Sequence, residues 1–144
     1  MLVVPDAVRN AIIDRAVEGA PNEVCGVLAG TDGNHVRIVD RAIPTPNAAV
    51  EPETTYEIDP VTLLETVESI EAGGDDVVGF YHSHPTGPPE PSATDVADAT
   101  WEGYAYLICS LDPTITLGVW RWTGDRFVRE RVRSGLRGSR TREC

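Results

Sequence analysis

A short apolar run that ends in two histidines constrains this chain more than any other segment. The run Val77–Tyr81 is β-branched and aromatic and follows a Gly-Gly-Asp-Asp turn, which is the pattern of a buried strand. His82 and His84 come at its end, and Pro85 stops the strand. Residues two apart on a strand point to the same side of the sheet, so both imidazoles can converge while Ser83 faces away. We expect Ser83 and Pro85 to shape this segment.

The chain after Pro85 delivers a carboxylate to the same place. A Gly/Pro-rich turn leads into Ser92 and then Asp95. Two imidazoles and one carboxylate are the ligand set of an open catalytic zinc site, whose fourth position is left to water. We therefore predict one Zn²⁺ ion held by His82, His84 and Asp95. The pattern Ser-x-x-Asp also predicts a helix capping box, and the two interpretations are compatible because a capped first turn is a rigid mount for a ligand.

This arrangement, H-S-H-P with seven residues between the second His and a Ser, then S-x-x-D, resembles the signature of the JAMM (MPN+) zinc metalloproteases. That family also needs an upstream glutamate that opens a strand, and Glu23 stands in this setting before the apolar run Val24–Leu28. The resemblance covers nearly all of the chain and points to the single-domain prokaryotic or archaeal type. It implies an α/β fold of the three-layer, cytidine-deaminase-like kind, in which helices flank both faces of a mixed β-sheet.

The resemblance also implies an activity. It implies a zinc-dependent isopeptidase that cleaves after the Gly-Gly C-terminus of a small ubiquitin-like, β-grasp modifier, as desampylases do. Zinc lowers the pKa of its bound water to roughly 7. Glu23 would accept a proton from this water and deliver it to the departing amine. Ser92 has two open assignments, as the helix cap or as the donor that stabilises the tetrahedral oxyanion.

Three alternative functions share parts of this pattern. A peptidase that processes the C-terminus of a sulfur-carrier protein would use the same site residues, so a modifier, its protein conjugates or a sulfur carrier are the expected partners. A non-catalytic MPN scaffold usually lacks the metal ligands, and the complete set argues against it. A RadC-like, nucleic-acid-linked role has the Arg-rich C-terminal segment as its only support.

The charge of the chain argues against nucleic acid as a partner. The net charge is −11, and six of the twelve basic residues, all of them Arg, lie from Arg129 onward. The body of the chain is therefore strongly acidic, which disfavours binding to phosphate backbones. No stretch approaches the length of a membrane span, and the N-terminus lacks a basic region followed by an apolar core. We expect a cytoplasmic protein without membrane contact.

The cysteines agree with this compartment. Cys25, Cys109 and Cys144 are odd in number and show no C-x-x-C spacing, so they form no disulfide framework. Cys25 and Cys109 stand inside apolar strand patterns, where small buried side chains are expected, and a bridge between these two is left open.

Apolar periodicity and turn residues predict one domain over residues 1–133 and a disordered Arg-rich tail over 134–144. The loop from Thr45 to Glu57 is either one wall of a substrate groove or a flexible connector. Residues 23–30 and 35–43 form a predicted hairpin across a Thr-Asp-Gly-Asn turn. The expected helices are 5–18, 60–72 and 92–102, and the other expected strands are 56–58, 77–81, 104–111, 114–122 and 126–132.

Overall fold

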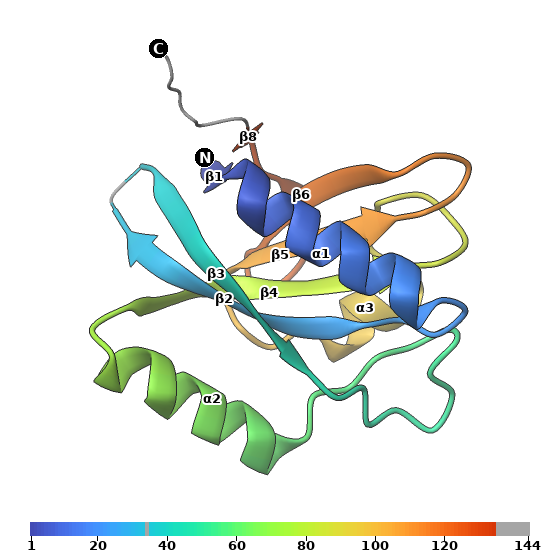
Figure 1. Cartoon of the computed structure of the whole chain (residues 1–144), viewed down its shortest axis with the longest axis horizontal. Coiled ribbons are helices and arrows are strands. Elements are labelled where there is room, and N and C mark those ends of the chain that lie inside the picture. The colour runs from blue at the N-terminus through green and yellow to red at the C-terminus, as the bar shows by residue number, and fades with distance from the viewer. Residues whose placement is uncertain (34, 135–144) are drawn as a thin grey trace.

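The protein is built around an eight-stranded mixed β-sheet. The computed structural model describes residues 1–33 and 35–134. The strand order is β7-β6-β5-β4-β2-β3-β1-β8, and β4 lies near its centre (Figure 1). β4 pairs antiparallel with β2 and parallel with β5. The strands are β1 Leu2–Val4, β2 Cys25–Asp32, β3 Arg37–Thr45, β4 Asp76–His84, β5 Ala105–Ser110, β6 Thr116–Trp122, β7 Phe127–Arg129 and β8 Val132–Ser134.

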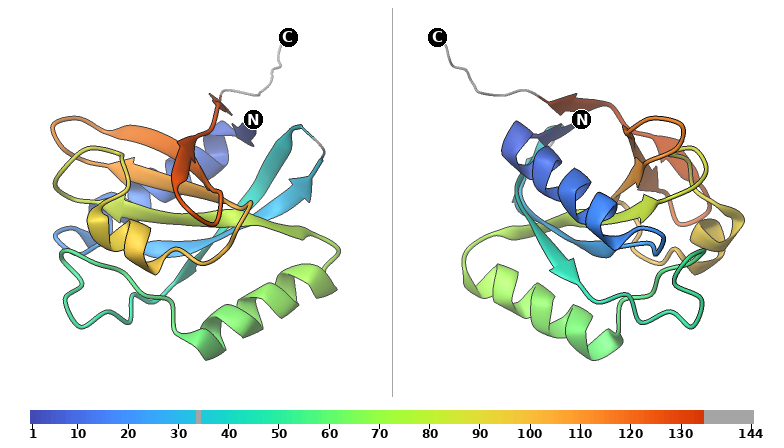
Figure 2. Two further views of the ribbon diagram at one scale, coloured as in Figure 1. Left: turned by 180° about the vertical axis from the view of Figure 1, so that it is seen from behind. Right: turned by 45° about the vertical axis from the view of Figure 1, so that its right-hand side comes forward.

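Three helices cover the two faces of this curled sheet (Figure 2). Helix α1, Asp6–Gly19, packs on one face, and α2, Pro60–Ala72, packs on the other, where α3, Ala93–Asp98, also lies. The predicted class, a mixed sheet flanked by helices on both faces, is confirmed. Asp59 caps α2 by accepting from the amides of Val61 and Thr62, as an Asp-Pro helix start leads one to expect.

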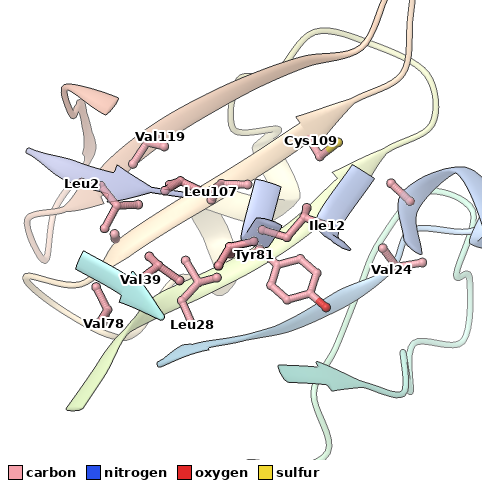
Figure 3. Close-up of a cluster of buried hydrophobic side chains, with 14 residues drawn as sticks. Leu2, Ile12, Val24, Leu28, Val39, Val78, Tyr81, Leu107, Cys109 and Val119 are labelled. Carbon is pink, nitrogen blue, oxygen red and sulfur yellow. The ribbon is translucent and has the colours of Figure 1, made fainter. Parts of the chain in front are cut away.

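Alternate residues of β4 divide the core between the two faces. Tyr81 points toward α1 and packs in a cluster with Ile12, Leu28 and Leu107 (Figure 3). Phe80 points to the opposite face and joins the aromatic cluster beneath α2 and α3. Burying side chains of this size stabilises the fold by roughly 1.5–3 kcal/mol each. Because the side chains of a strand alternate, His82 and His84 share the face of Phe80.

Several predicted boundaries were wrong, and tertiary contacts explain why. Residues 56–58 form no strand, because the amide of Glu57 bonds to the side chain of Asn47 instead of to a neighbouring strand. Helix α3 ends at Asp98 rather than near 102, since Trp101 leaves the helix to pack on Phe80. The expected strand 126–132 is two strands, because the chain changes partner from β6 to β1. The three-residue strand β1 was missed altogether.

Two further predictions concern the thiols and the tail. Cys25 and Cys109 are both buried and free, so the bridge left open by the sequence does not form. Residues 135–144 of the predicted tail, including Cys144, lie outside the described residues. Within the described part of the chain, no helix is both long and apolar enough to span a bilayer.

Candidate metal centre

The end of strand β4 and the start of helix α3 bring three polar side chains to one point. The Nε2 atoms of His82 and His84 lie 3.2 Å apart. Oδ2 of Asp95 lies 3.1 Å from the first and 3.2 Å from the second. The three residues are 1%, 7% and 9% exposed. A buried, nearly equilateral triangle of two imidazole nitrogens and one carboxylate oxygen therefore closes this end of the sheet.

The donor set and the spacing of this triangle fit a zinc ion. Ligand atoms 2.0–2.1 Å from a tetrahedral Zn²⁺ lie about 3.3 Å from one another, close to all three separations. Two neutral imidazoles with one carboxylate carry the charge and softness that zinc prefers, and three protein ligands leave the fourth position open. The residues present thus have the identity and the geometry needed to hold one divalent cation.

The ring of His84 is oriented by the loop that follows it. Its Nδ1 lies 2.9 Å from the carbonyl oxygen of Pro88, which can only accept, so the hydrogen belongs on Nδ1. In the neutral ring Nε2 therefore keeps a lone pair for a metal, and in the protonated ring Nε2–H donates to Asp95. Burial lowers the pKa of His84, but the hydrogen bonds with Asp95 and Pro88 outweigh burial and raise it.

The ring of His82 is held differently. It stacks on Tyr56 with 4.3 Å between the ring centroids, and its Nδ1 has no hydrogen-bond partner among the described residues. Burial lowers the pKa of His82, which favours the neutral form that a metal requires. Sequence reasoning missed Tyr56, although a tyrosine between Thr55 and Glu57 in an otherwise polar loop is a signal of an aromatic contact.

Asp95 and Ser92 form the predicted capping box. Ser92 Oγ accepts from the amide of Asp95 at 3.0 Å, and Oδ2 of Asp95 accepts from the amide of Ser92 at 2.9 Å. Burial would raise the pKa of Asp95, but the hydrogen bonds from His82 and His84 lower it well below its usual value. The cap uses Ser92 Oγ only as an acceptor, so its own O–H remains available to donate.

Glu23 lies beside the triangle, two residues before β2 rather than at its first position. Its side chain is buried, and Oε1 has no hydrogen-bond partner within the described chain. Possible ligand atoms of Glu23, His82 and His84 all lie within 4.8 Å of one another. Burial raises the pKa of Glu23 to about 7, with His84 acting to lower it and Asp95 to raise it. This carboxyl group can therefore both take and give a proton near neutral pH.

The backbone of Glu23 is fixed from both sides. Its amide donates to Pro52 O at 2.7 Å, and its carbonyl accepts from Asn47 Nδ2 at 2.9 Å. The next residue, Val24, donates its amide to Ser83 Oγ at 2.8 Å. Ser83 therefore points away from the two histidines, as predicted, and ties the start of β2 to the metal strand. Pro85 directly follows the last residue of β4.

The loop between β3 and α2 forms one wall of a cleft at this site. A cavity of about 310 Å³ has Glu23, His84 and Ser92 in its lining, together with Glu53 and Pro88. Asn47, which sequence reasoning also missed, fixes the loop: its Nδ2 donates to the Thr55 carbonyl, and its Oδ1 accepts from two loop amides. The only signal for this role is an Asn within a Pro-rich loop, a residue that commonly bonds nearby backbone.

The sequence of this chain is similar to those of several prokaryotic proteins. Residues 5–123 match Prok-JAB, the prokaryotic homologs of the JAB domain. The chain is 51% identical over 123 residues to the desampylase of Haloferax volcanii, covering 83% of this chain and 86% of that protein. It is 36% identical over 112 residues to the probable TtuB-protein conjugate cleaving protease of Thermus thermophilus, with coverage of 78% and 72%.

Two further similarities extend this set. The CysO-cysteine peptidase of Mycobacterium tuberculosis is 36% identical over 110 residues, which cover 76% of this chain and 73% of that protein. The solution structure of protein DSY2949 from Desulfitobacterium hafniense superposes with a TM-score of 0.84 at 29% identity, covering 93% of this chain and 92% of that one. Sequence and structure thus point to the same group of proteins.

Proposed function

This chain belongs to the prokaryotic JAB/MPN (JAMM) metalloprotease family, and we propose that it is a zinc-dependent isopeptidase that releases small ubiquitin-like modifiers from protein conjugates. The observation that carries the proposal is the buried triangle of His82, His84 and Asp95, with the free carboxyl oxygen of Glu23 beside it. Relatives from Haloferax volcanii and Pyrococcus furiosus are both desampylases.

The metal ligands in this proposal are His82, His84 and Asp95. Glu23 is the other carboxylate within reach, but the separations of 3.1 and 3.2 Å favour Asp95 as the third ligand. A zinc ion bound there would act as a Lewis acid that polarises the scissile carbonyl and lowers the pKa of a water molecule. The burial of the three ligands keeps bulk water away from this charge.

Glu23 moves the protons in this reaction. Its carboxylate accepts a proton from the attacking water, and its carboxylic acid then donates that proton to the leaving amine of the substrate lysine. A pKa of about 7 suits both halves of the cycle, because neither form is strongly disfavoured at neutral pH. The backbone bonds to Pro52 and Asn47 hold Glu23 in place for both transfers.

Ser92 stabilises the oxyanion in this proposal. Its hydroxyl accepts a hydrogen bond as the cap of α3, and its hydrogen remains free to donate into the cleft that Ser92 lines. Loss of such a donor typically costs about a hundredfold or more in turnover. The Gly-Gly tail of the modifier would enter along the loop wall at Glu53, held through its backbone, because only glycine allows so close an approach to the reacting atoms.

A second candidate is supported by one relative. The similarity to a CysO-cysteine peptidase supports a peptidase that trims the C-terminus of a sulfur-carrier protein with the same residues. The greater identity to a desampylase, 51% against 36%, favours the isopeptidase. The complete ligand set argues against a non-catalytic scaffold. The match of residues 5–123 to Prok-JAB favours a JAMM protease over a RadC-like role. A cytoplasmic location remains a prediction.

The test is incubation of the purified chain with Gly-Gly-linked conjugates of a ubiquitin-like modifier, with zinc and with a chelator. We expect cleavage that the chelator abolishes and added zinc restores. Glu23→Ala should lose cleavage and keep the metal, whereas Asp95→Ala should lose most of the metal. Release of a single amino acid from a sulfur carrier, without cleavage of any conjugate, would favour the second candidate. Full activity of Glu23→Ala would refute the assigned proton carrier.

A further inference from the structure

The orientation of His84 depends on one backbone carbonyl. The Pro88 oxygen accepts from His84 Nδ1 and so leaves the Nε2 lone pair directed at the metal position. Partners that hold the second nitrogen of a metal-bound histidine are often as important as the ligands, and their loss commonly costs about 10–100-fold in metal affinity. Whatever holds the Pro88 carbonyl in place therefore affects the metal site.

The loop that contains Pro88 has few backbone hydrogen-bond donors with which to stabilise its own conformation. Residues 85–91 have the sequence PTGPPEP, in which four of the seven residues are proline and have no amide hydrogen. Such a segment cannot be fixed by strand pairing, and it forms no helix or strand here. Its carbonyls must be held by donors from other parts of the fold.

Two side chains on the sheet provide these donors, one on each side of Pro88. Ser110, the last residue of β5, donates its hydroxyl to the Gly87 carbonyl. Trp120 of β6 donates its indole N–H to the Pro89 carbonyl at 3.1 Å. Three consecutive carbonyls are thus occupied, and the middle one orients His84.

Strand β6 is also shaped to receive this loop. Gly118 lies on the same face as Trp120, and a Cβ atom at Gly118 would collide with the Pro89 oxygen and crowd the indole nitrogen. The guanidinium group of Arg129 lies over the Trp120 ring, 5.1 Å from its centroid, and keeps the indole in place. The absence of a side chain at Gly118 leaves room for the Pro89 carbonyl, and the indole N–H of Trp120 binds it there.

We propose that Trp120, together with Gly118, positions His84 for metal binding by seating the Pro89 carbonyl on strand β6. Trp120 is a positioning residue in this proposal, since its indole N–H acts on the Pro89 carbonyl and not on a metal ligand. The proposal rests on the proposed function in one respect, namely that His84 is a metal ligand.

The test compares Trp120→Phe with Trp122→Phe in the full chain. Trp120→Phe keeps an aromatic ring and removes the N–H donor. Trp122 lies two residues further on the same strand and face, is buried, and makes no side-chain hydrogen bond within residues 1–33 and 35–134, so it is a matched control for packing. We expect the dissociation constants of Zn²⁺ and Co²⁺, measured by competition with a chromophoric chelator, to rise about tenfold in Trp120→Phe. They should stay within twofold of wild type in Trp122→Phe.

A second readout requires no metal. Long-range ¹H–¹⁵N NMR spectra of the metal-free protein, recorded at a pH at which the His84 ring is neutral, should show the hydrogen on Nδ1 of His84 in wild type and in Trp122→Phe, and a mixture of tautomers in Trp120→Phe. Gly118→Ala displaces the same carbonyl by a different route, so it should reproduce both effects and replaces Trp120→Phe if that variant does not fold.

Zinc binding by the wild-type chain tests the proposed function, and the comparison of variants tests the role of Trp120. A wild-type chain that binds no zinc would refute the proposed function, whereas the NMR comparison would still test the seat on β6. Wild-type metal affinity and an unchanged His84 tautomer in the folded variants would overturn the role of Trp120.

Discussion

The ring of Tyr56 lies almost flat against the ring of His82, with 4.3 Å between the centroids and 21° between the planes. The two residues come from the loop before α2 and from the end of β4. This stack contacts the histidine whose Nδ1 lacks a hydrogen-bond partner among the described residues. Tyr56 therefore restricts the plane of the His82 ring, whereas the Pro88 carbonyl fixes the tautomer of His84.

This contact predicts a difference between two substitutions of Tyr56. Tyr56→Phe keeps the stacked ring and should bind zinc within about twofold of wild type. Tyr56→Ala removes an aromatic pair worth about 0.5–1.5 kcal/mol beyond its buried area and should weaken zinc binding roughly tenfold. Isothermal titration with zinc would measure both. Equal affinity of Tyr56→Ala and wild type would show that packing around His82 suffices without the stack.

The raised pKa of Glu23 predicts a pH dependence of stability in the metal-free protein. Folding raises this pKa from 4.5 to about 7, so the folded chain holds the proton more tightly than the unfolded chain does. The associated stabilisation is complete below pH 4.5 and is lost as the pH rises through 7. Urea unfolding between pH 5 and 8 should therefore show wild type losing stability relative to Glu23→Gln. Parallel pH profiles of the two proteins would contradict the assigned pKa.

Asp95 both caps helix α3 and faces the two histidines, and one substitution should remove the second role while it keeps the first. Asp95→Asn keeps an oxygen that can accept from the amide of Ser92, so α3 should remain folded. It loses the negative charge opposite the two histidines, and zinc affinity should fall by about 100-fold or more, which is at least the upper end of the loss typical for an outer-shell partner. Circular dichroism and a chelator competition would measure the two effects. Retained zinc affinity in Asp95→Asn would favour Glu23 as the third ligand.

The capping role of Ser92 predicts a complementary result. Ser92→Ala removes the acceptor for the Asp95 amide and should cost about 1 kcal/mol of stability. Its zinc affinity should stay close to wild type, while turnover falls by about a hundredfold or more if the hydroxyl stabilises the oxyanion. Comparing kcat with the free energy of unfolding separates the two roles. A loss of stability with unchanged kcat would restrict Ser92 to the cap.

The hydrogen bond between Ser83 and the Val24 amide predicts that removal of the Ser83 hydroxyl reduces catalysis but not metal binding. Ser83→Ala leaves the buried amide of Val24 without its partner, at a cost of about 1–3 kcal/mol. Because Val24 follows Glu23, the proton carrier should shift while the ligand triangle stays intact. We expect a lower kcat with an unchanged zinc dissociation constant. A variant that loses zinc would instead place Ser83 among the residues that shape β4.

The amino-acid sequence alone determined the parts of this site that depend on local geometry. His82 and His84 can be assigned to one side of a strand because backbone geometry imposes a period of two on any strand. Ser92 and Asp95 can be assigned to a helix start because capping acts within a single turn. Asp59 and Pro60 predict the start of α2 in the same way, because the cap and the first turn involve only neighbouring residues.

Tertiary structure decided what depends on register between distant segments. The pairing of Cys25 with His82 brings Glu23 to the metal side, and a slip of one residue would turn β2 to the opposite face. Tyr56 contacts His82, Asn47 bonds to Glu23 24 positions away, and Trp120 bonds to Pro89 31 positions away. None of these three contacts leaves a periodic signal in the sequence. Periodicity reports which face a side chain takes, whereas folding alone determines which distant backbone group it meets there.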